Sequence, residues 1–113
     1  LIALGTNAVA TDRMVRAGAA RGATGENAIR VSIGLADYLV APIGVVIPDS
    51  MMGEITAGIA GTVFGSRAKK LLIPIVHQHF TIVGLEQKPV SLLIAEAVEL
   101  IRAELASPGP PRE

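Results

Sequence analysis

The chain contains no cysteine, and its ten Lys and Arg residues are matched by ten Asp and Glu residues. Without cysteine there is no disulfide, no thiolate nucleophile and no cysteine-ligated zinc or iron–sulfur site. A net charge of zero provides no long-range attraction to nucleic acid or to an anionic membrane. We therefore expect neither as a partner, and we expect a cytoplasmic protein because the lack of cysteine fits a reducing compartment.

Long hydrophobic runs are also missing, although half of the 113 residues are apolar and the mean hydropathy is +0.53. The uncharged stretches 38–48 and 55–66 fall short of the roughly 20 residues that cross a bilayer. No basic segment precedes the first apolar residues, so no signal peptide is visible. The apolar residues therefore predict the core of one domain spanning residues 1–105. Their composition, rich in Ala, Ile, Val and Leu and poor in aromatics, is typical of a sheet covered by helices on both faces.

The first third of the chain predicts a strand, a helix and a second strand. Residues 1–5 are a short apolar run closed by a glycine, and a helix over 8–20 follows, capped by Asn7 or Thr11. Residues 23–34 are interpreted as a strand because Ile29, Val31 and Ile33 alternate with polar residues. A short helix capped by Thr24 is the alternative.

The rest of the chain continues the alternation. We expect strands at 37–42, 70–76 and 80–85, the last two as an antiparallel pair, and helices at 51–64 and 91–105. The Pro-rich segment 106–113 is expected to be a disordered tail. Strands alternating with helices predict a layered α/β domain with a mostly parallel sheet.

In such a sheet, ligands bind outside the carboxyl ends of the strands. The loops that follow residues 1–5 and 37–42, together with the turn at 74–77, are the predicted rim. The candidate cofactor-binding residues there are Gly5, Thr6, Asn7, Pro42, Ile43, Gly44, Asp49 and Ser50. No residue is assigned a catalytic role, since the serines lack a G-x-S-x-G elbow.

Four segments carry a resemblance to a known family: ALGTNAVAT, AGAARGATGENAI, ADYLVAPIGVVIPDSMMGEIT and KKLLIPI. In this order they resemble an uncharacterised family of small bacterial proteins described as Rossmann-like and of unknown function. Full-length members begin with a strand and a glycine-rich turn of the form IDGQGGGIG. The resemblance implies a nucleotide-binding type of fold and no established activity.

The same resemblance implies that a first strand, its glycine turn and a helix belong before residue 1. In the usual strand order of a doubly wound sheet, that strand lies between residues 1–5 and 37–42. Without it, either the edges of these two strands are exposed or the two strands pair directly with each other.

A dinucleotide fingerprint is missing, because no G-x-G-x-x-G occurs in the chain. The spaced glycines Gly22 and Gly25 are interpreted as a helix stop and a turn. No carboxylate follows residues 1–5, where an NAD-binding domain holds the ribose diol. Thr6 and Asn7 stand there with Arg13 and Arg16 further along the helix, which would suit the 2′-phosphate of NADP, or Thr6 and Asn7 simply cap the helix. The cofactor is open, with NADP or NAD possible.

Asp49, Ser50 and Glu54 have two alternative interpretations. They either cap the helix expected at 51–64 or contact a ligand. The apolar loop 42–48 before them is expected to be covered, either by a ligand or by a protein partner.

The pair His77 and His79 has a spacing that can bind a metal, but no third ligand accompanies it, so no metal is predicted. Gly53, Ala57 and Gly61 fall four residues apart and leave one stripe of the expected helix bare. That stripe either packs on the sheet or forms a two-fold contact in a homodimer.

Two functions therefore stay open. The first is a nucleotide-binding domain, in which NAD(P) is one possible ligand. The second is a non-catalytic interaction or regulatory subunit that uses the loop 42–48.

Overall fold

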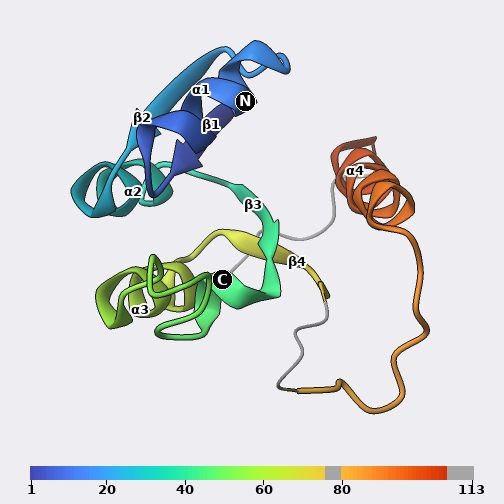
Figure 1. Cartoon of the computed structure of the whole chain (residues 1–113). Coiled ribbons are helices and arrows are strands. Elements are labelled where there is room, and N and C mark those ends of the chain that lie inside the picture. The colour runs from blue at the N-terminus through green and yellow to red at the C-terminus, as the bar shows by residue number, and fades with distance from the viewer. Residues whose placement is uncertain (76–79, 107–113) are drawn as a thin grey trace.

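The computed structural model describes residues 1–75 and 80–106 of the chain (Figure 1). Helices and strands alternate through most of this region, which makes the protein mixed α/β. The elements are β1 (Ile2–Gly5), α1 (Ala8–Arg16), β2 (Arg21–Thr24), α2 (Glu26–Ile33), β3 (Tyr38–Pro42), the 3-10 turn η1 (Ile43–Val46), α3 (Ala57–Gly65), β4 (Lys69–Ile73) and α4 (Val90–Ala106).

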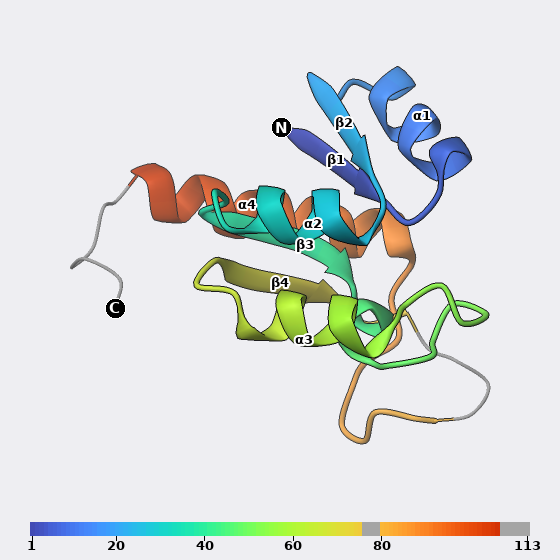
Figure 2. The ribbon, with the colours of Figure 1, turned by 90° about the vertical axis from the view of Figure 1, so that its left-hand side faces the viewer.

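The described strands form two parallel pairs. β1 pairs with β2, with Ile2 opposite Arg21, and β3 pairs with β4, with Tyr38 opposite Lys69. Figure 2 shows the strands in the order β2, β1, β3, β4 with their carboxyl ends toward the same side. The parallel direction confirms the expectation, but β1 and β3 are not hydrogen-bonded to each other, so the direct pairing of residues 1–5 with 37–42 is wrong.

Residues 23–34 are not one strand. β2 ends at Thr24, Gly25 turns the chain with a φ of +99°, and α2 follows. Ile29 and Ile33 alternate with polar residues as a strand would require, but they are also four residues apart and are both buried on one face of α2. Because a glycine with positive φ interrupts the pattern before these residues, the helical period decides the structure.

The helix expected at 51–64 begins only at Ala57. Asp49, Met51 and Met52 have positive φ angles between 54° and 66°, and Gly53 has a φ of +85°, so this segment is a turn. Thr56 is the N-cap of α3, and its side chain accepts a hydrogen bond from the backbone N–H of Ile59 at 3.1 Å. The capping role expected for Asp49 and Ser50 is therefore wrong.

The strand expected at 80–85 is absent. Among the described residues, β4 pairs in parallel with β3, and residues 80–85 contain a turn at Gly84 instead of an antiparallel partner. A glycine with a φ of +83° interrupts the apolar run before it can extend as a strand. The helix predicted at 91–105 is confirmed with one further residue at each end, and the helix predicted at 8–20 ends at Arg16.

The two faces of the strands are packed differently. Leu4 of β1 and Leu39 of β3 contact a buried cluster formed mainly by α2, α3 and the loop before α3, which we call the α2–α3 core. It consists of Ile29, Ile33, Ile55, Ile59, Ala60 and Val63. Gly5, the neighbour of Leu4, instead faces Thr11 of α1. Since successive strand residues point to opposite faces, α1 and α2 lie on opposite faces of β1.

α4 packs on β4 and lies on the face opposite α2 and α3 (Figure 2). No helix among the described residues is long and apolar enough to span a membrane.

Candidate functional site

The candidate site is the edge at which the parallel strands end. Gly5 ends β1, Thr24 ends β2 and Pro42 ends β3, and each is followed by a turn that leads into the next element. The backbone N–H of Gly25 donates to the carbonyl oxygen of Gly5 at 2.9 Å, which holds the first two turns together. The predicted rim residues of β1 and β3 therefore lie at one edge of the molecule.

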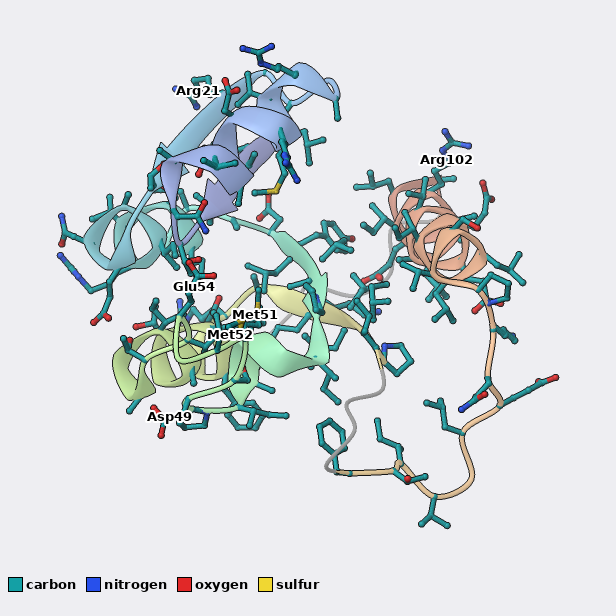
Figure 3. The ribbon with its side chains drawn as sticks, in the orientation of Figure 1. Arg21, Asp49, Met51, Met52, Glu54 and Arg102 are labelled. Carbon is teal, nitrogen blue, oxygen red and sulfur yellow. The ribbon has the colours of Figure 1, made fainter. Side chains whose placement is uncertain are left out.

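Asn7 performs two tasks at this edge. Its side-chain oxygen accepts from the backbone N–H of Ala10 at 2.9 Å, which confirms it as the cap of α1. Its side-chain nitrogen donates to Glu54 at 2.8 Å, across 47 residues of sequence. Figure 3 shows Glu54 reaching from the loop before α3 toward the β1 half, whereas Asp49 points away on the other side of that loop. Glu54 therefore supplies a carboxylate at the end of β1, where the local sequence has none.

A second contact between the two halves involves a carboxylate that sequence reasoning missed. Thr56 donates its hydroxyl proton to Glu26 at 2.5 Å, so the cap of α3 also holds the first residue of α2. A Cβ on Gly58 would lie 2.5 Å from the Glu26 carboxylate, so the glycine makes room for this approach. The negative charge also lies at the N-terminus of α3, where the helix dipole stabilises it. The sequence signal that could have identified Glu26 is a glycine followed by an acidic residue, which is typical of the first turn of a helix.

The loop 42–48 is covered by the protein itself. η1 packs against α3, Gly44 is buried, and Val45 and Val46 contact the α2–α3 core. Ser50 donates to the carbonyl oxygen of Gly44, which ties the following turn to η1. Of the predicted site residues, Ser50 and Gly44 are thus together, but the Ser50 hydroxyl is engaged in holding the loop.

The turn 49–53 between η1 and α3 is strained. Asp49, Met51 and Met52 adopt the left-handed region, which disfavours side chains other than those of Gly, Asn and Asp. The backbone N–H of Asp49 donates to the carbonyl oxygen of Ile55 at 2.7 Å and closes the turn. Met52 is fully exposed at its tip. Strain of this kind gathers at ligand-binding and switching sites.

Gly5 is needed for packing as well as for its place at the rim. A Cβ at this position would lie 2.3 Å from the Thr11 hydroxyl oxygen. Thr11 is buried, donates to the carbonyl oxygen of Asn7 and accepts from Thr24 at 2.8 Å. The hydrogen bond with Thr24 joins α1 to β2, and Gly5 lets α1 approach β1 closely, so Gly5 and Thr11 together fix the shape of the rim.

The arginines of α1 are not gathered at the rim. Arg16 lies in the last turn of α1 and pairs with Asp12 at 2.8 Å on the surface, and Arg13 lies one turn before the helix end. No group of three His, Cys, Asp or Glu suited to a metal occurs within residues 1–75 and 80–106. His77 and His79 lie outside the residues that the structure describes, so the metal spacing seen there is not tested.

A second candidate is an open hollow of about 470 Å³ between β4 and α4. Lysines line it, but each is engaged. Lys69 pairs with Glu104 at 2.7 Å, Lys88 pairs with Glu96 at 2.8 Å, and Lys70 donates to two backbone carbonyl oxygens. The hydrogen bond with Glu96 raises the pKa of Lys88 above its usual value. Because two of its lysines are paired with glutamates and the third is held by backbone carbonyl oxygens, this hollow is a weak candidate for binding an anion.

The three residues of the expected glycine stripe do not lie on one helix. Gly53 belongs to the strained turn, while Ala57 and Gly61 are exposed on α3, and a Cβ on Gly61 would meet nothing within 4 Å. The expectation that the stripe packs on the sheet is wrong, because Ile59, Ala60 and Val63 form the buried side of α3. The homodimer contact stays a prediction.

One family model, described as a domain of unknown function (DUF3842), matches residues 1–106. No curated protein and no solved structure matches the chain.

Proposed function

Since the chain belongs to the DUF3842 family, a family of unknown function, we propose that it is a Rossmann-like nucleotide-binding domain. Its site is the rim at the carboxyl ends of the strands. The observation that carries the proposal is the contact between Asn7 and Glu54, which gathers a carboxylate and an amide from distant segments at the end of β1.

The arrangement of the strands supports this place for the ligand. Open parallel sheets bind ligands outside the carboxyl ends of their strands, where the order of the strands reverses. Here the chain passes from β1 outward to β2 and then returns through α2 to β3 on the other side of β1. The rim between β1 and β3 is this reversal point, and we propose that Gly5 and Thr6 on one side and Pro42 and Ile43 on the other contact the ligand.

Glu54 is proposed to accept hydrogen bonds from the hydroxyl groups of a ribose. A carboxylate has two oxygens that each accept more than one hydrogen bond, and the ribose diol presents two donors side by side. Asn7 holds the Glu54 side chain by its amide, so the acceptor is oriented before the ligand arrives. In dinucleotide-binding domains an acidic residue after the second strand performs this role.

This contact also changes the expected choice between dinucleotides. The sequence favoured the 2′-phosphate of NADP because of Thr6, Asn7 and the two arginines of α1. In the structure, however, Arg16 is paired with Asp12. The Glu54 carboxylate also accepts a hydrogen bond from Asn7 at this position. A 2′-phosphate beside Glu54 would meet a like charge, which disfavours binding. We therefore propose that the rim prefers a free ribose, as in NAD or an adenine nucleotide, over NADP.

The test is ligand-dependent stabilisation of the natural polypeptide that carries this sequence, measured by thermal shift with NAD, NADP, ATP and AMP in turn. A ligand present at 100 times its Kd adds about 2.7 kcal/mol to the free energy of unfolding. We expect a shift with at least one nucleotide that has a free ribose and a smaller one with NADP. The absence of any shift, at ligand concentrations up to the millimolar range, would overturn the proposal.

Glu54→Gln is the discriminating variant. It removes the negative charge and keeps a partner for Asn7, so we expect weaker binding of NAD and a reduced preference against NADP. Glu99→Gln is the matched control, because Glu99 is an exposed glutamate of α4, far from the rim in sequence, and pairs with Arg102 of the same helix at 3.1 Å. If both variants bind like the parent, Glu54 does not contact the ligand.

A further inference from the structure

The strained turn 49–53 projects beyond the carboxyl ends of the strands, on the side of the molecule where the proposed ligand binds. Figure 2 shows the loop that leads from η1 into α3 extending past the ends of β1 and β3. Glu54, which comes directly after the turn, accepts a hydrogen bond of 2.8 Å from Asn7 at the end of β1. The turn is therefore tied to the rim through the residue that we propose to hold the ribose.

The tip of this turn holds two methionines in a conformation that methionine disfavours. Met51, Met52 and Gly53 have positive φ angles in succession, of 54°, 57° and 85°. In the left-handed region the Cβ atom of an L-residue lies too close to the backbone, so glycine is usual there and asparagine or aspartate is the common exception. Gly53 fits this preference, whereas Met51 and Met52 do not.

Packing does not account for a methionine at position 52. The Met52 side chain is fully exposed, so it buries no apolar surface in the structure. A single exposed apolar side chain is ordinary on a protein surface, but this one also occupies a backbone conformation that glycine or asparagine would adopt at a lower free energy. Strain without compensating burial is typical of positions that contact a ligand.

The backbone of the turn is fixed from both ends. The backbone N–H of Asp49 donates to the carbonyl oxygen of Ile55 at 2.7 Å, and Ile55 is 2% exposed within the α2–α3 core. Inside the turn, the backbone N–H of Gly53 donates to the carbonyl oxygen of Ser50 at 3.2 Å. These bonds close the turn on itself, so a defined backbone presents Met52 beside the rim.

From these observations we propose that Met52 is a specificity-determining residue of the nucleotide site. Its thioether packs on the flat face of the base whose ribose is held by Glu54, so that Met52 favours ligands with an aromatic base over ribose phosphates without one. This inference rests on the proposed function and adds to it the group that recognises the base.

The chemistry and the position of Met52 both suit this contact. The sulfur of methionine is polarisable and makes favourable contacts with aromatic rings, and every nucleobase presents such a ring. Met52 comes two residues before Glu54, a span of at most about 7 Å along the backbone. In Figure 3 Met52 and Glu54 lie close together, and Asp49 lies on the other side of the loop. Because the base is attached to the ribose ring next to its hydroxyl groups, a side chain at this distance from Glu54 is placed to meet the base.

Methyl NMR of the natural polypeptide that carries this sequence tests the contact directly. The sequence contains three methionines, of which Met14 lies in the last turn of α1, away from the rim. With NAD, ATP and AMP added in turn, we expect the Met52 methyl signal to move upfield, because an aromatic ring shields the nuclei above its face. The Met14 signal is the internal control and should not move. Ribose 5-phosphate, which has no base, should not move the Met52 signal upfield.

Two substitutions separate this contact from a structural role. Met52→Asn removes the thioether and introduces a residue that tolerates the left-handed region, so the melting temperature of the free protein should stay the same or rise. The affinity for whichever of NAD, ATP and AMP stabilises the parent should fall about three- to tenfold. Met52→Leu keeps an apolar side chain of similar size and should recover most of that loss. A lower melting temperature for Met52→Asn would indicate a structural role and overturn the proposal.

The outcomes distinguish this inference from the proposed function. If a nucleotide stabilises the protein but neither moves the Met52 signal nor binds Met52→Asn more weakly, the inference is wrong and the nucleotide site at the rim stands. A Met52 signal that moves equally with ribose 5-phosphate also overturns the inference, because the base is then not its cause. If none of NAD, ATP and AMP stabilises the protein at millimolar concentration, the proposed function and this inference are both wrong.

Discussion

The α2–α3 core and an exposed apolar stripe of α4 contain the same kinds of residue but differ in what covers them. The exposed stripe, which we call the α4 stripe, consists of Val90, Ile94, Val98 and Leu105. Ile59 in the core is 4% exposed and Ile94 in the stripe is 47% exposed. α3 packs against two neighbours, α2 and η1, whereas α4 packs mainly on β4. α3 is buried because a second element packs against it, whereas among the described residues no second element covers the α4 stripe to the same extent.

The largest effect is expected from truncation in the core. Ile59→Ala should lower the free energy of unfolding by about 2–5 kcal/mol, because it leaves a cavity where Ile29, Ile55 and Val63 meet. The matched substitution Ile94→Ala on α4 should change it by less than about 0.5 kcal/mol in the chain as printed. Urea denaturation of the two variants gives both values. Equal losses would remove the difference between the two regions.

The elements also differ in how well the sequence predicts them. Elements with one clear period, such as β1, β3 and α4, were predicted within a residue or two, because their patterns admit a single reading. α2 was only the alternative to a strand, because Ile29 and Ile33 satisfy both periods and the backbone turn at Gly25 decides between them.

The candidate site was predicted in part for the same physical reason. The cap Asn7 follows from local sequence, since an N-cap and its partner are three residues apart. Its contact with Glu54 spans 47 residues and depends on the path of the strained turn 49–53, for which the only local signal was Gly53. The role of Thr56 was hidden in the same way, because the helix was expected to begin before it.

The second largest effect on stability is expected where α1 packs on its strands. A Cβ on Gly22 of β2 would lie 2.6 Å from side-chain carbons of both Thr11 and Val15. Gly22→Ala should therefore cost about 1–3 kcal/mol by overpacking. The control is Gly61→Ala, which meets open space on α3 and should stabilise by about 0.5–1 kcal/mol through helix propensity. Thermal and urea unfolding would measure both, and a neutral Gly22→Ala would mean that α1 packs loosely like α4.

The cap of α3 gives a smaller effect within the well-packed region. Thr56→Ala removes the acceptor for the Ile59 N–H and the donor to Glu26, and should cost about 0.5–2 kcal/mol. Thr56→Ser keeps the hydroxyl and should recover most of that loss. If Thr56→Ser is as unstable as Thr56→Ala, the methyl group rather than the cap is responsible.

The smallest effect is expected on the outer side of α3, where Ala57 and Gly61 are exposed. Ala57→Leu places a large side chain in open space, so it should change the free energy of unfolding by less than about 0.5 kcal/mol. A homodimer through this side predicts otherwise, because the added side chain would clash with the second copy and lower both the melting temperature and the sedimentation coefficient. Measured together at several protein concentrations, these two quantities separate the cases. If the melting temperature and the sedimentation coefficient are both unchanged, the exposed side of α3 makes no contact with a second copy, and α3 packs through its buried side alone.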